Sequence, residues 1–247
     1  MKSLITTACL IGLSTFAFAQ TAEEIVNQYL DNIGGRSKLE AIQATQMEAK
    51  VDAGGMTLPV KMIQTKKGES MISFELQGRV IVQQAFDGTT AWGVNFQTMK
   101  AEKSESEVSE NMKRSLGDFP DAFLNYKANG YTLEKMADET VEGTSCFKIK
   151  LTKKKQLSEG KEVENVVYYF FDKNDMVPIM TETEVMSGPA KGTIAQTVLS
   201  EYQEVDGVYF PFSITQRSKG GPGQTIVIDK VIMNPTIDSK LFKFEAQ

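Results

Sequence analysis

The sequence of 247 residues contains no histidine. Histidine is the commonest side chain to act as a general base near neutral pH and to bind transition metals. Its absence excludes Ser-His-Asp and Cys-His nucleophile pairs and all histidine-ligated metal sites. We therefore expect no catalytic residue, no metal and no cofactor, and we predict that the protein is not an enzyme.

Cysteine is scarce as well, because the chain has only Cys9 and Cys146. Cys9 falls in a stretch with the pattern of a secretory signal peptide: a charged start, an apolar run over 4–18 and a small-x-small exit at 17–19. Cleavage would leave Cys146 alone, so no internal disulfide could form. An alternative treats Cys9 as a lipidated cysteine after Thr6-Thr7-Ala8, but the apolar run before it is brief.

No later segment has the roughly 18 or more apolar residues that a membrane-spanning helix needs. We therefore expect a signal peptide over 1–19 and one soluble domain over 20–247. The chain has 27 basic and 32 acidic residues, a net charge of −5, and loss of the leader removes one lysine and no acid. Binding of nucleic acid requires a basic surface, so no nucleic-acid partner is expected.

The start of the predicted domain has helical signals. Thr21 and Glu24 have the spacing of a capping box, and apolar residues then recur on one helical face as far as Ile33. Gly34-Gly35 ends this helix, and a shorter helical piece is predicted over 37–42.

A second helical region, which we call the insert, is predicted over 104–129, where a pair of helices interrupts the strands. Ser104 and Glu107 have the spacing of another capping box, and Gly117 ends the first helix. The second helix is predicted to begin near Pro120 and to carry an apolar stripe that must pack on the surrounding sheet.

The rest of the chain alternates apolar and polar residues with a period of two, which predicts strands. Short turns connect them, so neighbouring strands should be antiparallel, and the absence of crossover helices predicts a meander. About 11–12 strands in one sheet must curl, so we predict a mainly β (α+β) fold with one strongly curved antiparallel sheet. The expected strands span 45–53, 57–66, 69–77, 80–86, 91–96, 131–137, 145–153, 163–171, 177–185, 193–204, 208–217 and 225–233.

One face of this curved sheet is predicted to be apolar and concave, and too wide for its own side chains to fill. The candidate lipid-binding residues are the apolar members of this face and of the insert that would cover it. An ordinary packed core would show the same alternation, so that alternative stays open. The candidates are Ile72, Phe74, Leu76, Trp92, Phe210, Phe212 and Ile214 on strands, with Leu116, Phe119 and Phe123 on the insert.

Several short motifs support a family resemblance. They are Ile25-Val26-x-x-Tyr29-Leu30-x-x-Ile33-Gly34-Gly35, Phe86-Asp87-Gly88-x-x-x-Trp92, Tyr169-Phe170-Phe171-Asp172 and Asp206-Gly207-Val208-x-Phe210-Pro211. Together they resemble the outer-membrane lipoprotein-sorting proteins, the LolA-like periplasmic carriers, in a Bacteroidetes-type form.

The resemblance implies an unclosed β-barrel of the LolA/LolB/LppX kind, with the N-terminal helix and the insert acting as plug or lid. It also implies a periplasmic location and an apolar cavity that shelters the acyl chains of a lipoprotein or another lipid during transfer toward the outer membrane. The expected partners are such acyl chains and inner- and outer-membrane transfer proteins. Relatives hold the lid with a cavity arginine, but no motif assigns that role among Arg36, Arg79, Arg114 and Arg217.

Three functional hypotheses are compatible with these features. The first is a lipid or lipoprotein carrier without a covalent step. The second is a non-enzymatic envelope sensor or protein-interaction domain with a filled interior. The third is a lipid esterase that depends on a serine such as Ser104 or Ser145, which the absence of histidine and of a nucleophile-elbow motif disfavours.

Overall fold

The structure is a computed structural model that describes residues 20–245. The predicted signal peptide over 1–19 and Cys9 lie outside the described residues, so both remain predictions. Among residues 20–245, no helix combines the length and the apolar character that crossing a membrane would require.

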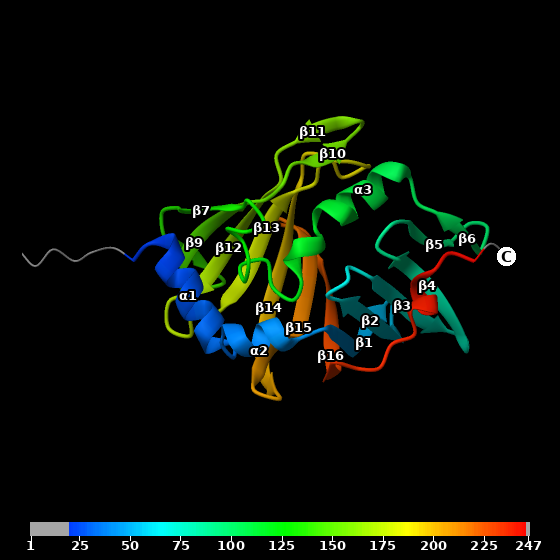
Figure 1. The fold of residues 1–247 in the computed structure, drawn as a ribbon, viewed down its shortest axis with the longest axis horizontal. Helices are drawn as coiled ribbons and strands as arrows, with labels where there is room; N and C mark the ends of the chain where they lie inside the picture. Colours follow the sequence, from blue (N-terminus) through cyan, green and yellow to red (C-terminus); the bar gives the residue numbers. More distant parts are fainter. Residues whose placement is uncertain (1–19, 246–247) are drawn as a thin grey trace, which may run out of the picture.

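The described chain is built around a single antiparallel sheet of 14 strands (Figure 1). Its order is β6-β5-β4-β3-β2-β1-β16-β15-β14-β13-β12-β9-β7, and β8 also pairs with β9. The first strands are β1 (Ala44–Ala53), β2 (Met56–Thr65), β3 (Ser70–Leu76), β4 (Arg79–Phe86), β5 (Ala91–Asn95) and β6 (Lys100–Lys103). The others are β7 (Thr132–Lys135), β8 (Glu139–Val141), β9 (Thr144–Thr152), β12 (Val166–Asp172), β13 (Pro178–Glu184), β14 (Ile194–Val205), β15 (Val208–Ser218) and β16 (Gly223–Met233).

The edge strands β6 and β7 do not pair with each other, so the curved sheet is not closed into a barrel. This confirms the predicted fold class. The predicted strands are all present, with bounds shifted by a few residues at most. The structure adds four short strands that the sequence did not indicate, namely β6, β8 and the separate hairpin of β10 (Gln156–Ser158) and β11 (Lys161–Val163).

The prediction of one uninterrupted meander is wrong. β1 pairs with β16 in the middle of the sheet, with Thr45 opposite Met233, so two meanders are joined by a contact between the two ends of the domain. The segment after β6 then carries the chain from one edge of the sheet to the other. A pairing between strands so distant in sequence leaves no local signal.

The helices are α1 (Ala22–Asn32), α2 (Arg36–Ala41), α3 (Ser106–Arg114) and the short 3-10 helices η1 (Leu116–Asp118) and η2 (Ser239–Phe242). The capping box of Thr21 and Glu24 is confirmed, because the Glu24 N–H donates to Thr21 Oγ1 and the Thr21 N–H donates to Glu24 Oε2. The capping box at Ser104 is wrong, since α3 begins after Glu105 without a side-chain cap.

The second helix of the insert is also wrong, because residues 119–130 form turns. The Asp121 side chain accepts a hydrogen bond from the Phe123 N–H at 2.8 Å. A short polar side chain that binds nearby backbone in this way stabilises a turn in competition with a helix. The insert therefore consists of α3, η1 and these turns, and it spans residues 104–130.

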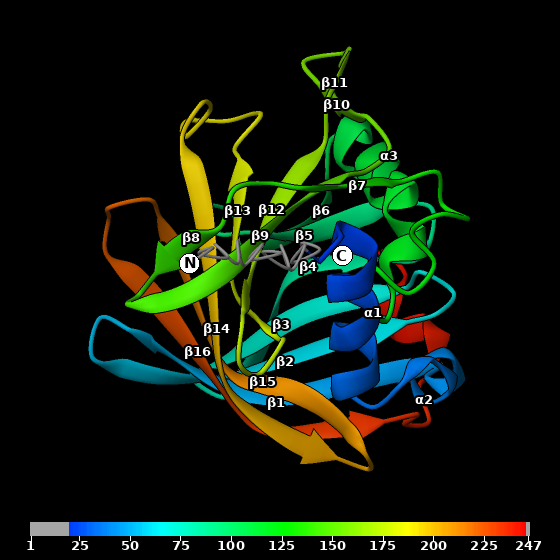
Figure 2. The same cartoon turned by 90° about the vertical axis from the view of Figure 1, so that its left-hand side faces the viewer.

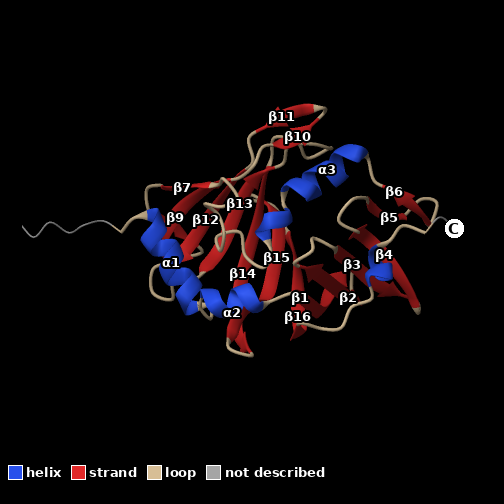
Figure 3. Cartoon of the chain, in the orientation of Figure 1, coloured by secondary structure: helices blue, strands red, loops and turns tan. Residues whose placement is uncertain are grey.

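The sheet has two distinct faces, and its inner face is the one toward α1, α2 and α3 (Figures 2 and 3). On β3, Ile72 and Phe74 point to the inner face, while Met71 packs in a separate cluster on the outer face. The C-terminal segment with η2 covers that outer cluster through Phe242. The helices and the C-terminal segment therefore cover opposite faces.

The sheet also has two ends. Successive hairpin turns of an antiparallel sheet alternate between its ends. The turns β1–β2, β3–β4, β5–β6 and β15–β16 share one end, which we call the tip end, as the pairs Ala53–Met56, Leu76–Arg79 and Val51–Ile226 show. The turns β2–β3, β4–β5 and β14–β15 lie at the other end, beside α2.

Candidate functional site

One half of the inner face, over β7, β9 and β12, is filled by the protein's own side chains, and we call it the filled half. Phe123 of the insert is fully buried there, with its ring centroid 4.6 Å from that of Tyr169 and 5.8 Å from that of Phe171. Members of this cluster come from the helices, the insert and the sheet: Ile25, Val26, Tyr29, Leu30, Leu39, Phe123, Leu124, Tyr126, Ile149, Leu151 and Phe171.

A half-buried carboxylate fastens the insert over the filled half. The Tyr29 hydroxyl donates to Asp121 Oδ2 at 2.6 Å, which links α1 to the insert. Burial raises the pKa of the Asp121 carboxyl, and the hydrogen bonds from Tyr29 and from the Phe123 backbone offset part of that rise. Burial and the nearby Asp121 also raise the pKa of Tyr29. Tyr29 is buried and Asp121 is half-buried.

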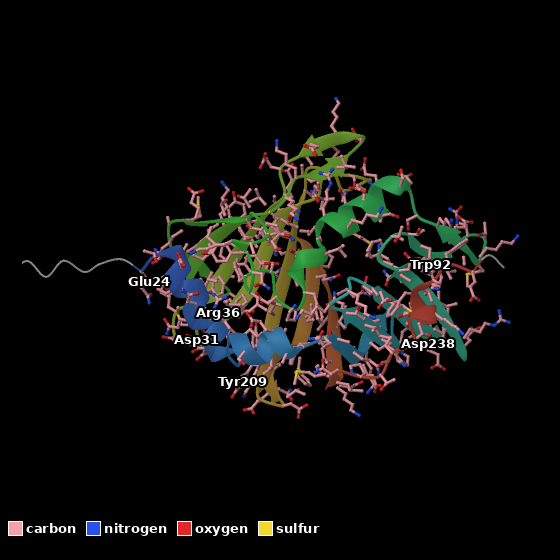
Figure 4. All side chains as sticks on the ribbon, viewed as in Figure 1. Glu24, Asp31, Arg36, Trp92, Tyr209 and Asp238 are labelled. Atoms are coloured by element: carbon pink, nitrogen blue, oxygen red, sulfur yellow. The ribbon has the colours of Figure 1, made fainter. Side chains whose placement is uncertain are left out.

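Two further contacts hold the insert. Asp118 accepts hydrogen bonds from the Tyr131 hydroxyl and from Lys153 Nζ, both at 2.7 Å. Arg36 Nη1 donates to the Leu124 carbonyl oxygen at 2.8 Å. Figure 4 shows Arg36 beside α1. Together with Asp121, these contacts join the insert to α1, α2 and β9 from several directions.

The other half of the inner face lies over β1, β2, β3, β15 and β16, and we call it the open half. Its cluster has a buried base of Ala49, Val60, Ile228 and Val231. Above this base the large apolar side chains are only partly buried, and no residue of a helix or of the insert belongs to the cluster within 20–245. The partly buried members are Met47, Val51, Met62, Ile72, Phe74, Val205, Phe210, Phe212, Ile214 and Ile226.

Most of the candidate strand residues come together in the open half. Ile72, Phe74, Phe210, Phe212 and Ile214 belong to its cluster, and Phe210 also packs against the filled half. Leu76 is half-buried and, by alternation along β3, points to the same face. The expectation that these residues line one continuous apolar surface therefore matches their positions.

Trp92 does not lie on this surface, so its placement on the concave face is wrong. It pairs with Ala85, which pairs with Met71, and all three belong to the outer cluster. Trp92 Nε1 donates to the Phe242 carbonyl oxygen at 2.7 Å. Figure 4 shows Trp92 near Asp238 and far from Arg36. The C-terminal segment therefore covers it.

The three insert candidates occupy different places. Phe123 is enclosed in the filled half, and Phe119 is half-buried against the same cluster. Leu116 packs over the β2–β3 turn so closely that a Cβ on Gly68 would lie 2.0 Å from Leu116 Cδ2. Leu116 and Phe119 line a cleft of about 450 Å³ between α3, η1 and this turn, with Phe86 on its sheet side.

Sequence analysis missed several residues of the open half and the fastening residues of the filled half. Val51 lies between Lys50 and Asp52, so the period-two pattern could have identified it, whereas Ile226 lies in the apolar run Ile226-Val227-Ile228, which does not indicate a face. Asp121 and Tyr29 are 92 positions apart, and no local pattern connects them. Within the described residues, no group of three or more Cys, Asp or Glu side chains is placed to hold a metal ion.

Comparison with protein-family models gives no match, and comparison with curated proteins gives none either. Solved structures do match. A LolA superfamily protein from Nitrosomonas europaea has a TM-score of 0.54 and 14% identity, over 92% of this chain and 99% of that one. A DUF1329 family protein from Desulfovibrio piger has a TM-score of 0.56 and 13% identity, over 91% and 98% of the two chains.

A lipoprotein-sorting domain of the outer-membrane kind from Vibrio parahaemolyticus has a TM-score of 0.51 and 10% identity, over 89% of this chain and 94% of that one. Identities this low show a shared fold and no more. The fold of this chain is thus that of LolA superfamily structures, in agreement with the resemblance of its sequence motifs.

Proposed function

We propose that this protein is a non-enzymatic periplasmic carrier that binds the acyl chains of a lipid or lipoprotein in the open half of its inner face. The observation that supports this most strongly is the cluster of partly buried apolar side chains to which no described helix contributes a residue. A large apolar surface on a soluble protein commonly marks a binding site. A curved sheet gives such a surface the shape of a trough.

The energetics of the open half suit a hydrocarbon ligand. Burial of a methylene contributes about 0.8 kcal/mol, so an acyl chain of ordinary length gains roughly 10 kcal/mol before the costs of association. Met47 and Met62 lie in the wall, and methionine adapts its shape to irregular apolar partners. Neither a charged anchor nor a covalent step is required to hold the chain.

The packing of the filled half also supports this proposal. Asp121, Asp118 and Arg36 fasten the insert over a core of buried side chains, which favours the open half as the place for a ligand. Phe123 is then part of the scaffold, and the lipid-binding role falls to Ile72, Phe74, Leu76, Phe210, Phe212 and Ile214.

The similar structures suggest which kind of molecule the protein would carry. One is described as a LolA superfamily protein and another as a domain of an outer membrane lipoprotein-sorting protein. A chain with their fold and an uncovered apolar trough suits transfer of lipoproteins or lipids toward the outer membrane. Membrane transfer proteins would then be the donor and acceptor.

Binding of a fluorescent fatty acid tests the proposal. The wild-type protein should bind the probe and should carry lipid in native mass spectrometry after purification from cells. Phe212→Ser should weaken probe binding about 10-fold, because it removes a large part of the apolar wall.

Val227→Ser is the matched control, since Val227 lies on the outer face of the adjacent strand and is 50% exposed. It should change binding less than twofold. Equal effects of the two substitutions, or no binding by the wild-type protein at unchanged stability, would contradict the proposal. Ester turnover that depends on Ser104 or Ser145 would instead support the esterase hypothesis.

A further inference from the structure

Exposed apolar side chains gather at the tip end of the sheet. Met56, Val80, Phe96 and Met99 are between 51% and 68% exposed. They occupy three successive hairpin turns or the strand ends beside them, namely β1–β2, β3–β4 and β5–β6. Single exposed apolar residues are ordinary, whereas a group on adjacent turns indicates an interaction surface.

Basic side chains surround these apolar residues. Arg79 begins β4 and Lys100 begins β6, and neither forms an ion pair within the described residues. Lys240 and Lys243 join Arg79 in lining a hollow of about 630 Å³ whose walls also include Val80 and Met99. Glu245 is the one acidic residue in that lining. This local charge differs in sign from the chain's net charge of −5.

Two of the acidic residues near the three turns have partners of their own, while Glu75 lies exposed on β3 opposite Val80. Asp52 Oδ1 accepts a hydrogen bond from the Gly55 N–H at 2.9 Å inside the β1–β2 turn. Glu102 accepts hydrogen bonds from the side chains of Asn95 and Thr98. The basic groups therefore remain available to an external anion, while two of the acids are engaged in the turns.

The tips are continuous with the open half. The ring of Phe96 stacks on the ring of Phe74, with centroids 6.1 Å apart and planes 17° from parallel. Phe74 belongs to the open half, and Leu76 continues the same face toward the β3–β4 turn. An apolar path thus runs from the exposed tips into the trough.

We propose that the hairpin tips β1–β2, β3–β4 and β5–β6 dock on a membrane surface that carries anionic headgroups. This inference rests on the proposed carrier function. Met56, Val80, Phe96 and Met99 enter the interfacial region, while Arg79, Lys100, Lys240 and Lys243 contact headgroup phosphates. An acyl chain then reaches the open half along Phe96 and Phe74 without crossing water.

A membrane fits this surface better than a folded protein partner does. Single apolar side chains on separate turns, interleaved with unpaired bases, need no shape-complementary partner surface. A fluid anionic surface accommodates them, since long-range attraction to lysine and arginine acts together with shallow apolar insertion.

Flotation with vesicles tests the docking surface. The wild-type protein should float with phosphatidylcholine vesicles that contain phosphatidylglycerol, and much less with pure phosphatidylcholine vesicles. Each basic residue near an anionic surface contributes about fivefold, so the loss of two should weaken vesicle binding roughly 25-fold, and the reversed charges of Arg79→Glu with Lys100→Glu should weaken it further. Phe96→Ser with Met99→Ser should weaken it about 10-fold.

Two substitutions elsewhere on the surface serve as controls. Lys67→Glu changes an exposed lysine in the β2–β3 turn, at the opposite end of the sheet, and Val227→Ser changes an exposed apolar residue on the outer face. Neither should alter flotation by more than twofold. Equal losses in tip and control variants, or no flotation of the wild-type protein, would overturn the docking surface.

The fluorescent fatty acid separates this inference from the carrier function. In solution without vesicles, the charge-reversed variant should bind the probe as the wild-type protein does. A protein that binds the probe but does not float retains the carrier function and lacks the docking surface. Flotation without probe binding contradicts the carrier function but still supports the docking surface.

Discussion

The two halves of the inner face use the same sheet and the same alternation of side chains, yet their apolar side chains are buried to different extents. In the filled half, α1, α2 and the insert add Tyr29, Phe123 and other apolar side chains until the interior is closed. In the open half, the members of the cluster around Phe74 and Phe212 all come from strands, and the large side chains stay partly buried. Alternation therefore specifies an apolar face, while the elements laid over it decide whether that face becomes core or binding surface.

Replacing one aromatic residue by alanine in each half should show the largest difference between the two halves in lost stability. Phe123→Ala removes a fully buried ring and should lower the free energy of unfolding by about 3–5 kcal/mol. Phe212→Ala removes a partly buried ring and should lower it by about 1 kcal/mol, while weakening lipid binding. Urea denaturation measures both values. Similar losses of stability would mean that the two halves are packed alike.

Weakening the contacts that hold the insert should have a smaller effect on stability, and this effect should be confined to the filled half. Arg36→Gln weakens the hydrogen bonds to the Leu124 carbonyl and to Asn27, and it should cost about 2 kcal/mol. Amide hydrogen exchange should then accelerate in 119–130 and stay unchanged in β15 and β16.

Arg79→Gln provides the matched control for that experiment, because Arg79 is exposed and forms no ion pair among the described residues. It should change neither stability nor exchange. Faster exchange throughout the sheet in the Arg36 variant would show that the insert stabilises both halves equally.

The ionisation of Asp121 should have the smallest effect on the free energy of unfolding. A carboxyl whose pKa is raised by folding contributes most to stability below its unfolded pKa of about 3.8, and this contribution declines as pH rises through the folded pKa. Compared with Asp121→Asn, the wild-type protein should therefore lose relative stability with rising pH in this range. Unfolding free energies between pH 3 and 7 measure the trend, and a relative gain would show that folding does not raise the pKa of this carboxyl.

Local signals in the sequence predicted much of the fold. The Thr21–Glu24 capping box located α1, and period-two alternation located the strands of the large sheet. Alternation cannot say which of two faces is the inner one. For Trp92 that choice depends on its register with β4, and β3 and β4 pair through a register shift between Ile72 and Ser73.

The alternation of apolar and polar residues along the strands predicted part of the candidate site. Phe74, Phe210 and Phe212 met in the open half because each lies on the inner face of its strand. Phe123 became core because the rings of Tyr29 and Phe171 pack against it, and those contacts join distant parts of the chain. Covering elements are decided by tertiary packing, which no short motif encodes.

We expect a hydrocarbon chain to occupy the open half and not the filled half. Crosslinking with a photoreactive fatty acid, followed by mass spectrometry of the labelled peptides, tests this directly. The account predicts adducts on β1, β2, β3, β15 and β16, at or beside residues such as Met62, Phe74 and Phe212. Adducts confined to α1, β9 and β12, or adducts equally frequent on the outer face, would contradict it.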